Sequence, residues 1–477
     1  MNNLKNIGIV WFRNDLRLLD NEALTNAINS CDEVMPIYIF DERIFLGKTK
    51  FGFRKTGCKR AKFILESVID LKKNLQEIGS DLYIRIGKPE EIITQIANEC
   101  KASWVFCNRE MTSEEIEVQD ALEKNLWATG REVFYSRGKM LYYTADLPFP
   151  VLHTPDIFTN FRKEVERFVA VRLPLEKPTQ LKPFAQKNIE LGDMPCLSDF
   201  EFKDQQVDGL EQHFVGGETT ALNQLNYYIW ETGLIAKYKE SRNGLLGWDY
   251  SSKFSAWLSV GALSPKTIYH EIKKFESQKA ANESTYWLIF ELLWRDFFRL
   301  MGKKYINNIF KKGGLIGKDP GGHIDWALFD AWANGKTGVP FIDANMRELK
   351  ATGFMSNRGR QNVASFLVKD LGLNWLMGAE YFESQLIDYD PCSNYGNWNY
   401  IAGIGNDPRE DRYFNILSQA KKYDGDGEFV RYWIPELSKL PANLIHQPNL
   451  LTIDQLQELE IEDLNYPQPI IDVSKWN

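Results

Sequence analysis

The first 135 residues alternate between short apolar runs and longer segments in which apolar positions recur with helical spacing. The predicted strands are Asn6–Phe12, Glu33–Phe40, Asp81–Ile86, Trp104–Cys107 and Glu132–Tyr135. A helix is predicted from about Glu22, and further helices over Lys59–Ile78, Pro89–Cys100 and Ser113–Trp127. Strands separated by helices of this length predict βαβ units and a parallel sheet. Residues 1–135 are therefore expected to form an α/β domain.

Residues 136–215 have an irregular pattern with seven prolines, and only Phe158–Val169 is predicted to be helical. The apolar content of this stretch favours a linker wrapped on a surface over a disordered one.

Residues 216–440 show helical spacing almost throughout and predict an all-α domain. The predicted helices are Thr219–Thr232, Phe254–Val260, Pro265–Phe275, Trp287–Tyr305, Asp325–Ala333, Val339–Thr352, Arg360–Leu371, Trp375–Leu386, Asp407–Ala420 and Gly427–Ile434. Residues 441–477 form a short tail that is partly helical at Ile453–Ile461. The expected fold class is α/β plus all-α.

Composition narrows the class of protein. The 477 residues include 14 Trp, 20 Tyr and 29 Phe, which fits either a large aromatic core or a need for π-systems in stacking or electron transfer. The net charge of −8 gives no sign of a polyanion partner. The six cysteines form no CxxC pair and the five histidines are scattered, so neither a disulfide scaffold nor a zinc site is expected. With no signal peptide and no long apolar run, we expect a cytoplasmic protein that does not enter a membrane.

The common phosphate-binding motifs are missing. No GxGxxG follows the first strand, and Gly335-Lys336-Thr337 lacks the upstream glycine of a P-loop because position 330 is Asp330. A basic run extends from Arg295 to Lys318, where seven Lys and Arg residues accompany the single acidic residue Asp296. It fits either a solvated face or a phosphate-binding surface.

The predicted helix at 287–300 carries polar groups inside an apolar sequence. Trp287, Glu291, Trp294, Arg295 and Phe298 fall on one face. A buried carboxylate needs a partner. Either Glu291 pairs with Arg295 in a core, or this face is a cavity wall with one acceptor and two stacking platforms.

The segment from Tyr381 to Tyr400 is densest in candidate chemistry. Asp388 and Asp390 follow a helix end, and Pro391 and Gly396 are expected to force a turn. The two carboxylates suit a ribose hydroxyl or a metal, and structural pairing with Arg358 or Arg360 fits equally well. The stretch also supplies the amide of Asn394 and the rings of Trp398 and Tyr400.

A third segment, Tyr250-Ser251-Ser252-Lys253-Phe254-Ser255, places hydroxyls and a lysine before a predicted helix. Such groups can cap the helix or hold a phosphate at its N-terminus.

These three segments, together with Gly353–Asn362 and the opening Trp11–Arg17, resemble the photolyase/cryptochrome family, and most closely its DASH-type cryptochromes. The resemblance runs from about residue 7 to 440. It implies a Rossmann-like antenna-binding domain and a helical catalytic domain that holds a U-shaped FAD beneath a cavity for a flipped base.

The resemblance implies two groups of FAD contacts. The diphosphate region is expected at Tyr238, Ser251, Ser252, Lys253, Phe254 and Ser255. The ribityl chain and ring are expected at Arg295, Asn357, Arg360, Asp388, Asp390 and Asn394. Asn394 corresponds to the position facing flavin N5. Its amide does not readily donate a proton, which fits an anionic reduced flavin of the photolyase kind.

The implied activity is light-driven repair of cyclobutane pyrimidine dimers in DNA. Glu291 is expected to bind the base edge, Trp294 and Tyr400 to stack on the lesion, and Gln361 to line the cavity. Expected phosphate contacts are Arg242, Arg299 and Arg358. Duplex-repairing relatives usually carry Trp at the position of Tyr400, so a preference for single-stranded or locally unpaired DNA is expected.

Two alternative functions fit the sequence less well. A (6-4) photolyase is less similar, because Ser356 and Asn357 stand where that branch has two histidines that supply an acid. A blue-light receptor signalling through partners is disfavoured by the short tail after Leu440. We expect a monomer.

Two further features of the family are matched only in part. Photoreduction is expected to use Trp398 and Trp375, but the third family tryptophan aligns with Gly322, so either Trp326 replaces it or the route is truncated or rerouted. Glu110 lies where DASH relatives contact a folate, which implies 5,10-methenyltetrahydrofolate as an antenna.

Overall fold

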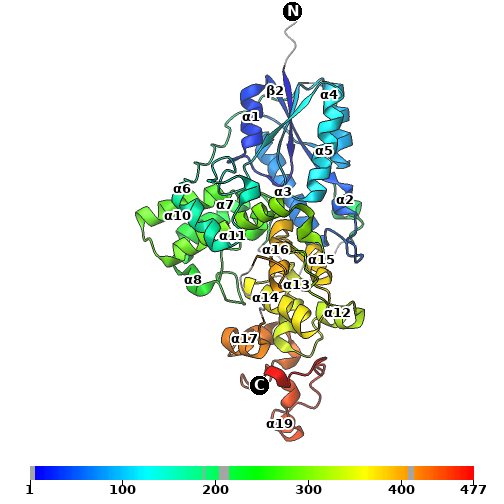
Figure 1. Cartoon of the computed structure of the whole chain (residues 1–477), viewed down its shortest axis with the longest axis vertical. Coiled ribbons are helices and arrows are strands. Elements are labelled where there is room, and N and C mark those ends of the chain that lie inside the picture. Colours follow the sequence, from blue (N-terminus) through cyan, green and yellow to red (C-terminus); the bar gives the residue numbers. More distant parts are fainter. Residues whose placement is uncertain (1–5, 186–187, 204–213, 407–412, 477) are drawn as a thin grey trace, which may run out of the picture.

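Five strands form one parallel sheet at the N-terminal end of the molecule in this computed structural model (Figure 1). The strands are β1 (Ile7–Phe12), β2 (Glu33–Asp41), β3 (Tyr83–Gly87), β4 (Trp104–Asn108) and β5 (Glu132–Ser136). Their order is β3-β2-β1-β4-β5, and every neighbouring pair is parallel. The structure describes residues 6–185, 188–203, 214–406 and 413–476. The predicted α/β class is confirmed.

The central strand β1 is buried on both faces, and its side chains alternate between two cores. Val10 and Phe12 belong to the core that includes residues of α1 (Glu22–Ser30) and α3 (Cys58–Glu77). Ile9 and Trp11 belong to the opposite core. That core is covered by α4 (Pro89–Cys100) and α5 (Ser113–Trp127). A short helix, α2 (Glu42–Phe45), follows β2.

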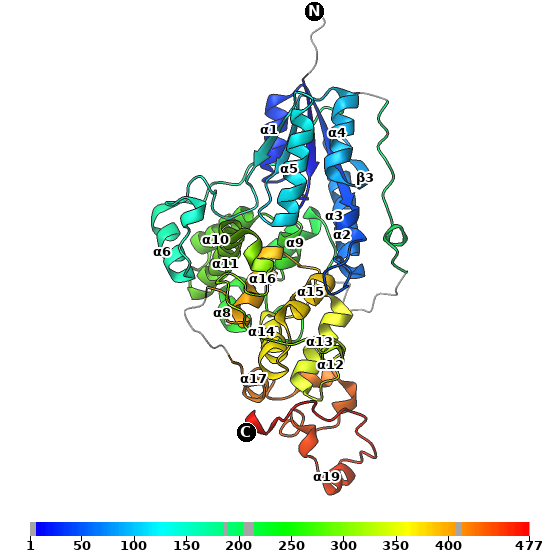
Figure 2. The same ribbon diagram turned by 45° about the vertical axis from the view of Figure 1, so that its right-hand side comes forward.

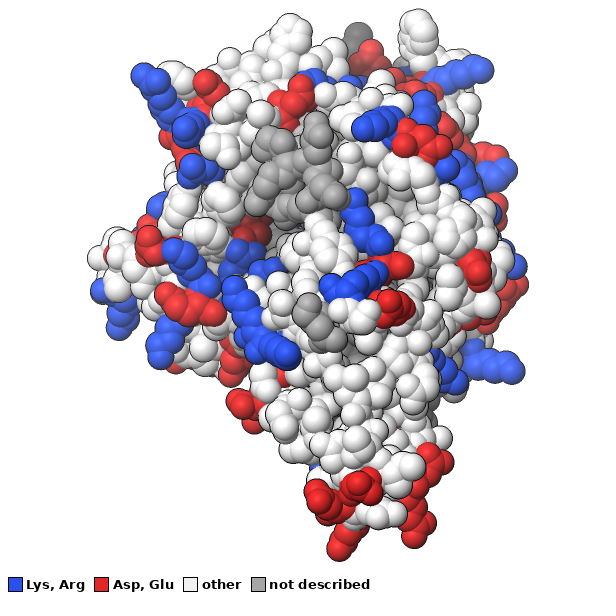
Figure 3. Space-filling view, turned by 60° about the horizontal axis from the view of Figure 1, so that its bottom comes forward, with Lys and Arg blue, Asp and Glu red and all other residues white. Residues whose placement is uncertain are grey.

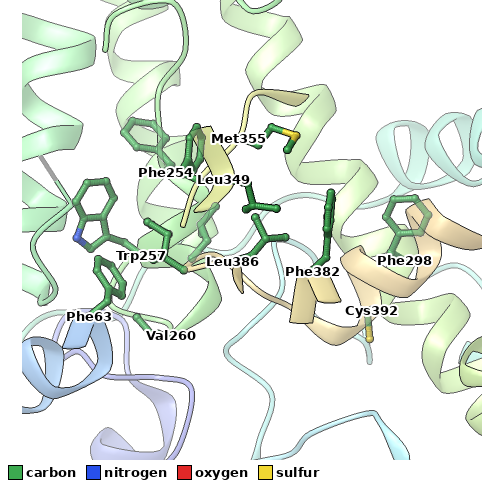
Figure 4. Packing of buried hydrophobic residues seen from close by; sticks show 14 of the residues in the cluster. Phe63, Phe254, Trp257, Val260, Phe298, Leu349, Met355, Phe382, Leu386 and Cys392 are labelled. Atoms are coloured by element: carbon green, nitrogen blue, oxygen red, sulfur yellow. The ribbon is translucent and has the colours of Figure 1, made fainter. Parts of the chain in front are cut away.

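The core beneath α1 and α3 continues into the helical half of the chain. Phe63 of α3 lies 6.1 Å, ring centre to ring centre, from Trp257 of α9 (Ser255–Ser259). Figure 4 shows these two rings with Phe254 on one side of the buried cluster and Phe382 and Phe298 on the other. Arg17 also donates to the carbonyl of Gly261 at 2.8 Å. The two halves therefore pack as one body.

Part of the proline-rich segment after β5 runs along the outside of the α/β half, and its helix lies beside the helical half (Figure 2). Its helix is α6 (Phe158–Phe168), with short 3₁₀ turns at Val151–His153 and Leu197–Phe200. The backbone N–H of Leu181 donates to Ile78, and Leu191 accepts from Ile84, each at 2.8 Å. These bonds hold the segment to the surface.

The remaining described chain is helical, as predicted for an all-α half. The helices besides α9 are α7 (Glu218–Asn226), α8 (Tyr238–Ser241), α10 (Pro265–Gln278), α11 (Glu283–Tyr305), α12 (Trp326–Ala333), α13 (Pro340–Thr352), α14 (Asn357–Ser365), α15 (Trp375–Gln385), α16 (Pro391–Ile401), α17 (Ile416–Tyr423), α18 (Glu428–Trp433) and α19 (Ile453–Glu458). Single π-helical turns extend α7 and α14 at Tyr227–Glu231 and Phe366–Asp370.

The predicted turn at Pro391 and Gly396 is wrong, because both residues lie in α16. Pro391 occupies the first helical turn, where its missing N–H costs nothing, and Asp390 is the N-cap. Gly396 allows close packing: a Cβ there would lie 2.4 Å from the ring of Phe298. The first six residues of the predicted helix Asp407–Ala420 lie outside the described residues. Within the described residues, the helix begins at Ile416.

Three charged side chains of α11 bind other segments of the chain; Asp296 and Arg299 are buried, and Arg295 is half-buried. Arg295 donates to the carbonyls of Lys139 and Leu258, at 2.7 and 3.1 Å. Asp296 accepts from the backbone N–H groups of Leu141 and Tyr142, at 3.1 and 2.9 Å. Arg299 donates to Asp390 at 2.5 Å.

The tail packs against the helical half rather than extending from it. Tyr466 donates a hydrogen bond to buried Asp343 of α13, and Lys475 pairs with Asp370 at 2.8 Å. Trp476 is buried. Among the described helices, none is long and apolar enough to cross a membrane.

Replacing Asp296 tests how strongly α11 depends on these contacts. In Asp296→Asn, the amide N–H₂ would face one of the two backbone N–H donors, so one of the two hydrogen bonds would be lost. The free energy of unfolding is therefore expected to fall by about 1–3 kcal/mol. Urea denaturation measures the change. The control is Asp325→Asn at the N-cap of α12, where Asp and Asn cap equally well and little change is expected. Equal effects of the two substitutions would contradict the assignment.

Candidate functional site

A cavity of about 460 Å³ opens in the helical half between α9, α11, α14, α15 and α16. Its volume lies within the range of small-molecule and cofactor sites. The structure brings together here most of the predicted site residues, although they are scattered over 160 positions of sequence. The predicted residues that line it are Tyr238, Arg242, Ser251, Ser252, Lys253, Phe254, Ser255, Glu291, Trp294, Arg295, Asn357, Arg360, Gln361, Asp388, Asp390, Asn394, Trp398 and Tyr400.

The α11 wall carries Glu291 and Trp294. Glu291 pairs with Arg242 at 2.8 Å rather than with Arg295. Burial raises the pKa of Glu291 by more than the Arg242 guanidinium lowers it. The cavity-wall interpretation is therefore the one that the contacts of Glu291 favour.

The two expected stacking rings lie next to each other. Trp294 packs edge-to-face on Tyr400, with ring centres 6.2 Å apart. On another side Trp294 stacks flat on Phe158 of α6 at 3.7 Å, with 7° between the ring planes. The linker segment thus fixes the orientation of a cavity ring, because the stacked pair leaves the indole little freedom to rotate.

The two aspartates before α16 are held by different arginines. Asp388 pairs with Arg360 at 2.8 Å, as one interpretation of the sequence expected, and its Oδ1 is buried with no hydrogen-bond partner in the described part of the chain. Asp390 accepts from Arg299 and from the backbone N–H of Ser393. Burial would raise the pKa of Asp390, but Arg299 and Arg295 outweigh it and hold that pKa below its usual range.

Asn394 lies one turn into α16 and lines the cavity. Its Nδ2 donates to the carbonyl of Ala379 in α15 at 3.0 Å. This bond fixes the amide at the cavity wall.

The segment before α9 forms an aromatic enclosure around a buried cation. Lys253 has a left-handed backbone with φ of 60°, and its ammonium lies 3.1 Å from the ring centre of Tyr250, with Phe354 at 4.9 Å. Burial lowers the pKa of Lys253 well below its usual value. Capping does not explain the segment, because the N-cap of α9 is Phe254 and no side chain caps that end.

Glu348 of α13 is a residue that the sequence interpretation missed. It is buried near Lys253 and Arg360, and its Oε2 has no hydrogen-bond partner among the described residues. Burial raises its pKa to about 8, although both cations lower it. Its position in the helix could have indicated burial, because Glu348 lies three residues after buried Asn345 and next to buried Leu349.

Two predicted phosphate contacts lie elsewhere. The assignment of Arg299 is wrong: its side chain is 5% exposed and its guanidinium is bound to Asp390, so no phosphate on the surface can reach it. Arg358 donates to Gln361 and Asn243, at 2.8 and 2.9 Å, and lies over the ring of Tyr423.

The three tryptophans expected in electron transfer have different surroundings. Trp398 lines the cavity and lies so close to Gly378 that a Cβ there would be 2.2 Å from the indole. Trp375 is 1% exposed and packs on Tyr395. Trp326 is 45% exposed. Gly322 has φ of 87°, and a Cβ would lie 2.8 Å from the carbonyl of Leu373, so a tryptophan does not fit there.

A second cavity, of about 830 Å³, lies between the α/β half and the helical half. Glu110 lines it and forms a buried ion pair with Lys139. Burial would raise the pKa of Glu110, but Lys139 outweighs it and the pKa lies below its usual value. Ser259, Tyr389 and Asp390 line both cavities, so the two share a wall.

Comparisons with known proteins agree with this architecture. Residues 8–180 match the family model described as DNA photolyase, and residues 287–477 match the FAD binding domain of DNA photolyase. Cryptochrome DASH of Gloeobacter violaceus is 48% identical over 467 residues, covering 98% of this chain and 93% of the relative. Cryptochrome DASH of Xenopus laevis is 48% identical over 473 residues, covering 98% and 90%.

Solved structures extend the comparison to three dimensions. A cryptochrome of Synechocystis sp. PCC6803 superposes with a TM-score of 0.96 at 46% identity, covering 100% of this chain and 98% of that one. A bacterial class III photolyase from Agrobacterium tumefaciens gives 0.86 at 29% identity, covering 100% and 96%.

The raised pKa of Glu348 predicts a pH dependence of stability. A folded-state pKa of about 8 against an unfolded value of 4.5 means that the folded protein keeps a proton that the unfolded chain releases. Relative to Glu348→Gln, the free energy of unfolding of the FAD-free wild type is therefore expected to fall by up to about 1.4 kcal/mol per pH unit across that window, and then to level off.

Urea denaturation at several pH values measures this difference. Glu164→Gln, at an exposed position of α6, is the matched control and should give a difference from the wild type that does not change with pH. A flat difference for Glu348→Gln as well would show that Glu348 does not hold the proton.

Proposed function

Because the chain belongs to the photolyase/cryptochrome family, and within it to the DASH-type cryptochromes, we propose that it is a light-dependent enzyme that splits cyclobutane pyrimidine dimers in DNA. The observation that carries the proposal is that two sets of predicted site residues line the same cavity. Glu291, Trp294 and Tyr400 lie on the same cavity as Asn394, Arg360 and Asp388. A base-binding group and two stacking rings thus adjoin the residues expected to hold a flavin.

The described residues fit FAD. Asp388 lines the cavity, and its buried Oδ1 has no hydrogen-bond partner among the described residues, so it can accept a hydrogen bond from a flavin or ribityl group. Tyr250 also lines the cavity, and its buried hydroxyl has no partner in the part of the chain that the structure describes. Lys253, buried in its aromatic enclosure, offers an ammonium group whose charged form a bound diphosphate would favour. Bound reduced FAD would supply, on excitation by blue light, the electron that opens the dimer and would receive it back.

The protein's part in this reaction is positioning. Arg360 and Asp388 hold each other, and Asn394 is fixed by Ala379, so the flavin side of the cavity is rigid before any ligand enters. Glu291, with a raised pKa, can hydrogen-bond a base edge, while Arg242 keeps its carboxylate oriented. Trp294 and Tyr400 present rings against which an extruded dimer can stack.

The proposed substrate is single-stranded or locally unpaired DNA. Extrusion from a duplex costs unpairing and unstacking, and this cost is least where the bases are already unpaired. Lys and Arg are interspersed with Asp and Glu over much of the face in Figure 3, and acidic side chains gather at its narrow lower end. The net charge of −8 does not attract a polyanion as a whole, so we expect local contacts such as Arg358 to bind phosphates.

A blue-light receptor is the second candidate function. The tail that such a role would use is fastened to α13 and to Asp370 by Tyr466 and Lys475. This anchoring favours repair over signalling by a released tail.

A cytoplasmic location and a monomeric state stay predictions.

The direct test is to illuminate the chemically reduced protein with dimer-containing single-stranded and duplex DNA. Dimer loss is expected to be faster on the single strand. Glu291→Ala removes a hydrogen bond to a charged group, so its rate is expected to fall about 10- to 100-fold with FAD retained. Glu283→Ala, at an exposed position of the same helix, is the control and should match the wild type. No dimer loss by the wild type on either DNA would refute the proposed activity.

The second cavity is proposed to hold 5,10-methenyltetrahydrofolate as an antenna. Its position on the shared wall, with Glu110 and Lys139 in its lining, supports energy transfer to the flavin. The purified protein is expected to absorb in the near ultraviolet beyond FAD and to release a folate on extraction. Glu110→Gln is expected to lower the folate content without changing the FAD content. A pure flavin spectrum with no extractable folate would contradict this assignment.

A further inference from the structure

The expected route of electrons into the flavin site does not reach the surface through Trp375. Trp375 is 1% exposed, and its indole N–H donates to the carbonyl of Lys312. The position where the family has the next tryptophan is Gly322, whose left-handed backbone and neighbour Leu373 leave no room for an indole. Trp326 packs instead on Phe51 and Phe53 of the α/β half.

We propose that electrons reach the flavin site through a different row of rings, from Trp326 through Trp332 to Trp398, bypassing Trp375. This inference rests on the proposed function, because it concerns how the flavin of that function becomes reduced.

The inner half of the row joins the cavity to Trp332. Trp398 lines the cavity and meets Phe382 edge-to-face, with ring centres 5.2 Å apart. Phe382 in turn stacks on Trp332, at 6.2 Å with 17° between the planes. A phenylalanine ring is too difficult to oxidise to hold the hole, but in contact with two indoles it couples them electronically.

The outer half of the row joins Trp332 to Trp326 by two parallel bridges. Phe329 lies 5.6 Å, ring centre to ring centre, from both Trp332 and Trp326. Tyr381 contacts Trp332 at 5.7 Å, and Phe53 links Tyr381 to Trp326 at 5.7 and 6.1 Å. Contact is therefore continuous from the cavity to Trp326.

The hydrogen bonds of these rings favour the indoles, rather than Tyr381, as the sites that carry the hole. The N–H of Trp332 donates to the carbonyl of Val363, which is not a base, so an oxidised Trp332 keeps its proton and the hole can move on. Tyr381 also donates to a carbonyl, that of Ala333, and burial raises its pKa to about 12. Oxidised tyrosine must lose its proton, and none of these contacts accepts it, so Tyr381 acts as a bridge.

Trp326 is the station that solvent reaches, since it is 45% exposed while Trp332 is buried. One electron leaves Trp398 for the excited oxidised flavin, one passes from Trp332 to Trp398, and one from Trp326 to Trp332. An external thiol then returns an electron to Trp326 and releases its proton to water, and two such thiols end as a disulfide. The balance is one thiol oxidised for each electron that enters.

The test uses the FAD-loaded, oxidised protein under blue light with a small dithiol and without oxygen. Bleaching of the oxidised flavin band is followed in Trp326→Phe, Trp332→Phe, Trp375→Phe and Trp398→Phe. Trp332→Phe and Trp326→Phe are expected to lose bleaching to the level of Trp398→Phe, while Trp375→Phe keeps the wild-type rate. Loss in Trp375→Phe, or retention in Trp332→Phe, would overturn the bypass.

Two controls keep the result interpretable. Trp127→Phe replaces a tryptophan that is 81% exposed on α5, and it should leave bleaching unchanged. Flash absorption should show a lasting indole radical in the wild type and a short-lived one in Trp332→Phe, which separates a broken route from a misfolded site. Dimer splitting by chemically reduced Trp326→Phe and Trp332→Phe does not use the row, so its failure in these variants and in the wild type would count against the proposed function and not against the route.

Discussion

Three charges of α11 that are wholly or partly withdrawn from water are the constraint on which the rest of the molecule depends. Asp296 and Arg299 are buried and Arg295 is half-buried among apolar neighbours, and each costs free energy unless it is paired. Their partners come from the linker, from α9 and from the start of α16. Satisfying these three groups therefore places the linker, α9 and α16 around one helix, and the cavity is the space that remains among them.

This arrangement explains why the two cavities share a wall. Asp390 caps α16, binds Arg299 and lines both spaces. Lys139 pairs with Glu110 on one side, and its carbonyl accepts from Arg295 on the other. The two cavities are thus held at a fixed separation by charges that also lie at the interface between the two halves.

Aromatic residues both fill the core and line the cavity. Phe63 and Trp257 fill the core that joins the halves, whereas Trp294 and Tyr400 line the cavity. Phe382 packs in the core and lies between Trp398 and Trp332. The aromatic core therefore also supplies the ring contacts of the electron route that we propose.

The local patterns of the sequence determined the elements and the chemistry carried on each. The apolar run of β1, the helical spacing in α11 and the residue types before α16 are all local, and so the strands and most of the helices could be predicted. About half of the residues that line the cavity were expected as well, mainly because the chain resembles the photolyase/cryptochrome family.

What the sequence could not decide were partners distant along the chain. Glu291 forms an ion pair with Arg242 rather than with the neighbouring Arg295, and Arg299 forms one with Asp390. Glu348 is buried near Lys253. Pro391 and Gly396 read locally as a turn, but N-capping by Asp390 and packing on Phe298 make them helical. Desolvation and close packing act between segments that only the folded chain brings together, so the tertiary structure alone selected these contacts.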